Sequence, residues 1–141
     1  MRTKLSVVVA GIGLLVVAAV PLWAHHSFWV EFDLNKPVRL QGTITKMKWI
    51  NPHAWLHIDV TTPDGTVEEW MIEGGVPNVL FRRGFTMKSL LPGQVVTVEG
   101  HQARNESLRA NGGDITFPDG QKLFFSFSGP TETFLRVLGS S

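Results

Sequence analysis

The sequence contains no cysteine and no tyrosine. Without cysteine there is no disulfide framework, no cysteine-based zinc site, no cysteine nucleophile and no residue to carry a lipid after an export signal. The sequence also lacks a Gly-x-Ser-x-Gly element, a phosphate-binding loop and a dinucleotide fingerprint, so the familiar enzyme classes have no support. A metal site would therefore use histidine, carboxylates or the chain terminus.

The chain also has no large excess of charge of one sign. The 141 residues include 13 Lys and Arg against 12 Asp and Glu, and 43% of them are hydrophobic. This composition excludes a highly charged disordered chain and fits one folded domain.

The one long hydrophobic run lies at the start of the chain. Two basic residues precede the uncharged run Leu5–Val20, and the small residue Ala24 follows it. This layout is typical of a secretory signal, so we expect residues 1–24 to be a signal peptide and the protein to be periplasmic or secreted. The alternative is an uncleaved anchor, because the apolar stretch is just long enough to span a bilayer. Only then would a membrane be a partner.

Cleavage would also change the charge balance. The remaining chain would hold 11 basic residues against 12 acidic ones, for a net charge near −1. Together with export, this charge argues against a nucleic-acid partner, because nucleic-acid binding depends on neutralising phosphates.

Alternation of apolar and polar residues predicts a β-rich domain over residues 38–130. A first strand starts at Val38, and Gly42 marks a bend in it. A second strand follows the turn residues Asn51 and Pro52. Its two faces are predicted to carry Ala54, Leu56, Ile58 and Val60 on one side and His53, Trp55, His57 and Asp59 on the other.

The later segments suggest a closed topology. After a turn at 63–65 we expect a strand at 66–72, a short helix at 76–84, a strand at 94–101, a polar loop at 104–113, and a hairpin of 114–117 with 121–127. This order is typical of an OB-fold, so the predicted class is all-β with one short helix, a five- to six-stranded OB-fold-like barrel. An open β-sandwich is the alternative. Residues 25–37 would be an N-terminal extension, and 131–141 a C-terminal segment that forms a last strand, a helix or a tail.

A terminal histidine is the first candidate for chemistry. If cleavage follows Ala24, His25 brings an α-amino group and an imidazole to one place, where both can chelate a metal ion. The amine has a reference pKa of about 7.7–8.0, and divalent copper is the first-row ion best able to displace its proton. A free N-terminal histidine resembles the histidine brace of secreted copper proteins, in which a second histidine completes the site.

The candidate second ligands are His26, His53 and His57. His53 and His57 share a strand face but stand about 13 Å apart, so at most one of them should join His25 or His26. The alternatives are that His25 and His26 form an exposed terminus that binds copper adventitiously, and that His53 only stabilises its turn.

A second candidate site is an aromatic surface. Trp49, His53, Trp55 and His57 would form an aromatic and imidazole surface on the wall of the barrel, with Trp55 as an exposed stacking platform. Asn51, in the turn before His53, is a further candidate ligand-binding residue. The partner of this surface would be a protein or a small ligand such as a carbohydrate. The acidic pair Glu68 and Glu69 points to opposite faces of a strand, and Arg109 has the pattern of an ordinary surface charge.

Four segments together resemble an uncharacterised family of small secreted bacterial proteins. They are AHHSFWVEFD at Ala24–Asp33, KPVRLQGTITKMKWINPHAWLHIDV at Lys36–Val60, the pair Trp70 and Glu73, and LPGQVVTVEG at Leu91–Gly100. The resemblance implies a His-His-Ser-Phe start of the exported chain, an Asn-Pro-His motif and one domain. Similarity in strand order to small periplasmic OB-fold proteins implies a binding module rather than a catalyst.

Three hypotheses follow. The first is an exported binding module that holds copper through His25 with His26 or His53. The second is a metal-free module that binds a protein or carbohydrate through Trp49, Trp55 and His57. The third is a copper-dependent redox enzyme that uses the same terminal histidine and would need an open coordination position.

Overall fold

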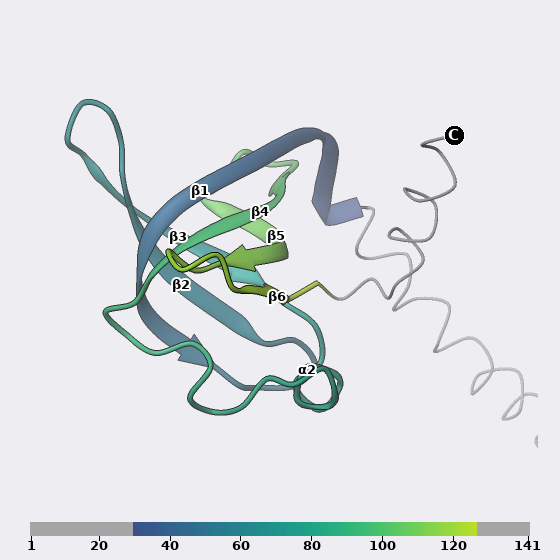
Figure 1. Cartoon of the computed structure of the whole chain (residues 1–141). Coiled ribbons are helices and arrows are strands. Elements are labelled where there is room, and N and C mark those ends of the chain that lie inside the picture. Colours follow the sequence, from purple (N-terminus) through teal and green to yellow (C-terminus); the bar gives the residue numbers. More distant parts are fainter. Residues whose placement is uncertain (1–29, 127–141) are drawn as a thin grey trace, which may run out of the picture.

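The computed structural model describes residues 30–126 (Figure 1). Six strands and one short helix follow one another along the chain. They are β1 (Phe32–Lys48), β2 (Trp55–Thr61), β3 (Val67–Glu73), α2 (Pro77–Arg82), β4 (Val95–Ala103), β5 (Arg109–Thr116) and β6 (Lys122–Phe124). The expected mostly-β domain with one short helix is thus confirmed. The predicted signal peptide, His25, His26 and the C-terminal segment lie outside these residues.

The strands form one sheet that closes on itself. Their order is β3-β2-β1-β4-β5-β6, and these neighbours are antiparallel. A further, parallel pairing joins β3 to β5. Five strands therefore make a ring of hydrogen bonds, with β6 attached to β5.

Strand β1 is long enough to take part in both halves of the ring. It pairs with β4 from Phe32 to Thr43 and with β2 from Thr43 onwards. The sequence predicts a bend at Gly42, but this residue pairs in regular register with Val96, and the register irregularities of β1 lie between Phe32 and Pro37 and between Ile44 and Lys46. A Cβ on Gly42 would be 2.6 Å from the carbonyl oxygen of Asp59. The strand starts six residues earlier than Val38, the expected start, because Phe32 is buried and pairs with Ala103.

The hairpin between β2 and β3 is formed as the sequence predicts. Ala54, Leu56 and Ile58 are fully buried, which confirms the apolar face of the second strand. The turn at its tip has Gly65 at a φ of 87°, and the backbone N–H of Thr62 donates to the carbonyl of Thr66.

Asp64 holds this turn, and its carboxyl group should make the hairpin sensitive to acid. Hydrogen bonds from the Thr62 hydroxyl and the Thr66 backbone N–H lower the pKa of Asp64 from 3.8 to about 2. The pKa of Asp64 is lower in the folded chain than in the unfolded chain, so the ionised carboxylate stabilises the fold at pH values above about 4. This contribution is lost as pH falls from about 4 to about 2. We expect Asp64→Asn to remove that part of the acid dependence. Unfolding free energies of the parent and the variant, measured by urea titration across this range, should differ most at neutral pH and converge in acid. A constant difference would contradict the prediction.

Helix α2 also has the predicted position. Pro77 occupies the first turn, where its missing N–H costs nothing, and Gly84 follows the helix end at a φ of 99°. Leu80 is fully buried and fixes the helix to the core.

Strand β5 corrects the expectation of a polar loop at 104–113. Residues 109–113 are part of the strand, because they pair with β4 on one side and with β3 on the other. Their sequence, Arg-Ala-Asn-Gly-Gly, has low β-propensity, so long-range pairing outweighs the local preference.

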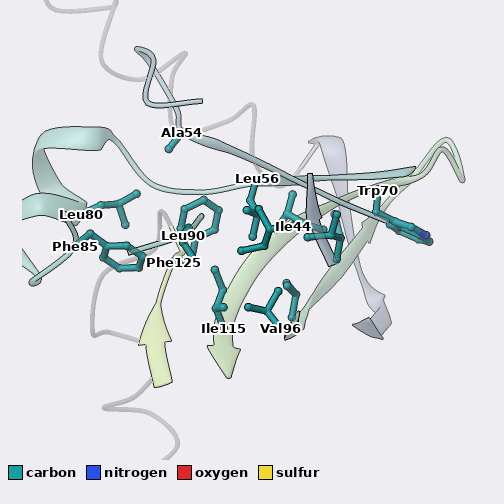
Figure 2. Packing of buried hydrophobic residues seen from close by; sticks show 14 residues of the cluster. Ile44, Ala54, Leu56, Trp70, Leu80, Phe85, Leu90, Val96, Ile115 and Phe125 are labelled. Atoms are coloured by element: carbon teal, nitrogen blue, oxygen red, sulfur yellow. The ribbon is translucent and has the colours of Figure 1, made fainter. Parts of the chain in front are cut away.

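The core fills the inside of the ring. Every ring strand contributes a fully buried side chain, namely Ile44, Leu56, Ile72, Val98 and Ile115. Figure 2 shows Leu80 and Phe85 at one end of this cluster and Trp70 at the other. Burial of each such side chain contributes about 1.5–3 kcal/mol to the free energy of folding, so the core accounts for much of the stability of the domain. From residue 30 to residue 126, no helix is long and apolar enough to cross a membrane.

Candidate functional site

The candidate site lies on the outer face of β2, opposite the core. Strand alternation turns Trp55 and His57 outward, and His53 precedes them just before the strand starts. In β3, Glu73 pairs with Trp55, and Met71 pairs with His57. The parallel pairing then places Arg109 of β5 beside Met71. These residues, with Glu69 of β3, are called the histidine face below.

His53 is held by a carboxylate. Its Nδ1 makes a short contact with Oε1 of Glu73, and the two side chains are 25% and 12% exposed. Because a carboxylate oxygen accepts, Nδ1 is the donor in this contact. Metal-binding histidines in proteins are commonly oriented in this way.

His57 makes a similar pair with a different carboxylate. Its Nδ1 lies 3.0 Å from Oε1 of Glu69, and its side chain is only 8% exposed. The sequence placed His57 on an imidazole and aromatic surface, whereas the structure buries it. The two histidines are therefore held by different carboxylates.

Trp55 is covered rather than open. The guanidinium of Arg109 stands 5.1 Å from the centre of its ring, and Nη2 of Arg109 lies 2.5 Å from Oε1 of Glu31. The expected stacking platform is thus occupied by a cation from β5. Arg109, expected to be an ordinary surface charge, belongs to the histidine face.

Trp49 and Asn51 do not belong to this face. Trp49 packs against Phe81 of α2 at 4.9 Å between ring centres and against Phe85 at 6.1 Å, so it extends the core. Asn51 is exposed in the connection between β1 and β2 and precedes Pro52 through a cis peptide bond.

Three polar atoms of the histidine face are buried without a hydrogen-bond partner. They are Nε2 of His57, Oε2 of Glu73 and Nε of Arg109. A buried polar atom without a partner costs about 1–3 kcal/mol, so such atoms are rare in stable folds. All three lie on one face, on three adjacent strands, and this makes the face the candidate site.

Sequence reasoning missed the carboxylates and the guanidinium of this face. Alternation along β3 puts Glu69, Met71 and Glu73 on one side, and this pattern could have indicated them. Nothing local indicates Arg109, because its place depends on the parallel pairing of β5 with β3.

No three histidine or acidic side chains within the part of the chain that the structure describes are grouped closely enough to hold a metal ion. His25 and His26, the first predicted ligands, lie outside residues 30–126.

The fold and the face together define a small β-rich domain with histidine–carboxylate pairs on an outer strand surface. The chain belongs to a family of unknown function (DUF6152), which matches residues 12–112. This confirms the expected membership in an uncharacterised family. No curated protein and no solved structure matches the chain.

Proposed function

We propose that the protein is an exported OB-fold-like binding module that binds divalent copper through its N-terminal histidine together with His53. The exported chain would start at His25 after removal of residues 1–24. His25 supplies an amine and an imidazole nitrogen, and His53 supplies a second imidazole. His26 is the alternative to His53 as the second histidine.

The barrel assignment is supported by the order of pairings. A ring of β1, β2, β3, β5 and β4, with the helix between β3 and β4, follows the strand order expected for an OB-fold. In OB-folds the outer surface of the second and third strands binds ligands. The histidine face lies on these strands.

The observation that carries the copper site is the contact between Glu31 and Arg109. This contact holds the start of the described chain beside Arg109, which covers Trp55. Trp55 pairs with Glu73 of the next strand, and Glu73 contacts His53. Glu31 follows His25 by six positions, a span of at most about 22 Å. An N-terminal histidine is thus within reach of His53.

A titration with copper(II) tests the proposal. Protein that starts at His25 should bind one copper ion, and one extra alanine before His25 should weaken binding by about a hundredfold or more, because the chelating amine is lost. His53→Ala should weaken it by about tenfold or more. Calorimetry gives the affinities, and electron paramagnetic resonance reports the nitrogen ligands.

His101→Ala is the matched control, because His101 lies on β4 and pairs with Asn111, away from the face of β2. This variant should bind copper like the parent. Equal, weak binding by the parent and the extended form would refute the copper site and leave the metal-free module as the function to test. That second function has less support, because Trp49 packs into the core and His57 is buried.

A further inference from the structure

One end of the ring carries five basic side chains that no carboxylate of residues 30–126 pairs with. They are Lys46 and Lys48 near the end of β1, Arg82 and Arg83 at the end of α2, and Lys88 in the connection from α2 to β4. The segments that hold them, 42–58 and 74–98, contain no Asp or Glu. Arg83 donates to the carbonyl of Ser126, which carries no net charge. This end, called the basic end below, therefore keeps its positive charge.

Exposed apolar side chains alternate with these cations along the chain. They are Ile50, Phe81, Met87 and Leu91, and their exposed fractions range from 37% to 63%. Phe81 directly precedes Arg82, and Met87 directly precedes Lys88. Each segment of the basic end thus offers apolar and cationic groups together.

Tertiary contacts bring these segments to the same end of the molecule. Trp49, which precedes Ile50, packs against Phe81 of α2 and against Phe85. The backbone of Ile44 in β1 exchanges hydrogen bonds with Gly93 and Gln94, so the stretch after Leu91 lies beside β1. Figure 1 shows α2 and the connection to β4 at one end and the tip of the β2–β3 hairpin at the other.

The hairpin end has the opposite charge. Residues 59–69 include Asp59, Asp64, Glu68 and Glu69 and no Lys or Arg. Opposite charges at the two ends orient the molecule in an electric field, with the basic end towards an anionic surface.

We propose that the basic end docks on the surface of an anionic phospholipid membrane. The Lys and Arg side chains lie among the phosphate headgroups, and the four apolar side chains enter the boundary between headgroups and acyl chains. Alternating cationic and apolar groups suit a partner whose anionic and apolar layers lie at different depths. An acidic protein suits them less, because it must offer a separate pocket for each apolar side chain. This docking depends neither on copper nor on an uncleaved anchor at residues 1–24.

Co-sedimentation with vesicles tests the inference in protein that starts at His25. This form lacks the apolar run of residues 5–20, which can enter a bilayer by itself. The parent should bind vesicles made of equal parts of phosphatidylglycerol and phosphatidylcholine, and it should not bind vesicles of phosphatidylcholine alone. Each cation near an anionic surface contributes about fivefold in affinity, so Arg82→Glu combined with Lys88→Glu should weaken binding by about twenty-five-fold or more. Met87→Ser should weaken binding by about fivefold, because an apolar contact is lost.

Two matched controls lie away from the basic end. Arg39→Glu reverses a charge in the part of β1 that pairs with β4, where Arg39 contacts Glu99. Val67→Ser removes an apolar side chain that is 59% exposed at the start of β3, in the acidic hairpin. Both controls should bind the vesicles nearly as the parent does, and circular dichroism shows that every variant is folded. Inorganic phosphate should release no more protein than sodium chloride of the same ionic strength, because the membrane surface rather than a single phosphate is bound.

Three results would overturn the inference. If the double variant at Arg82 and Lys88 binds like Arg39→Glu, or if the parent binds neutral vesicles equally well, the basic end is not the docking surface. If the parent binds neither kind of vesicle, no membrane is bound and an acidic protein is the partner to test. None of these results bears on the copper titration, so this inference and the proposed function can fail separately.

Discussion

Replacement of Phe125 by alanine is expected to destabilise the domain by about 3–5 kcal/mol. The side chain of Phe125 is fully buried, and its ring centre lies 6.0 Å from that of Phe85. Its ring rests against backbone: a Cβ on Gly112 would come within 2.7 Å of it, and a Cβ on Gly74 would overlap it. Since backbone cannot move in to fill the space, the cavity would remain open.

Urea unfolding followed by tryptophan fluorescence measures this loss. Phe124→Ala is the control, because the neighbouring ring is only half-buried and lies under the guanidinium of Arg83, 5.3 Å from its centre. That change should cost about 1 kcal/mol. Similar losses in the two variants would show that Phe125 has no special place in the core.

The importance of Phe125 could not be predicted from the sequence. Three phenylalanines occur between residues 124 and 127, and their spacing does not show which one is essential. The notch for the ring is formed by Gly74 and Gly112, which lie far from it in the chain. Packing of this kind depends on the assembled ring.

Segments with their own pattern were predicted well. The apolar side of β2, the Pro63–Gly65 turn and the helix with Pro77 near its start all have local causes, namely alternation, turn chemistry and helix capping. The start of β1 and residues 109–113 of β5 were not predicted. Their strand structure comes from partners distant in sequence, which override weak local propensity.

The candidate site shows the same division. Alternation along β2 placed His53, Trp55 and His57 on one side, and the structure agrees. Alternation says nothing about what lies across the sheet, so the burial of His57 and the position of Arg109 over Trp55 could not be inferred. Both follow from the register of β3 with β2 and with β5.

The parallel pairing of β3 with β5 therefore positions residues of the histidine face as well as closing the ring. It joins Met71 to Arg109 and Glu73 to Asn111, and it is short. Its position is fixed from the other side by β4, which pairs with β5 through an irregular stretch between Val98 and Gly100. A change in that stretch should disturb both the fold and the histidine face.

Gly100→Ala is expected to destabilise the protein by more than about 3 kcal/mol, a size reached only when strain or overpacking is severe. Gly100 pairs with Gly112 at the irregularity, and a Cβ on Gly100 would overlap the carbonyl oxygen of Asn111 and lie 3.0 Å from its carbon. Because these atoms belong to the backbone of β5, the clash is relieved only if β4 and β5 separate. Such separation moves Asn111 and, with it, the strand that carries Arg109.

Gly84→Ala separates this clash from the general cost of replacing a glycine. Gly84 has a φ of 99°, but a Cβ there would meet nothing within 4 Å, so only backbone strain of about 1–2 kcal/mol is expected. Thermal unfolding followed by circular dichroism compares the two variants with the parent. If Gly100→Ala loses no more stability than Gly84→Ala, the close approach of β4 to β5 does not limit the fold, and the position of Arg109 must depend on β3 alone.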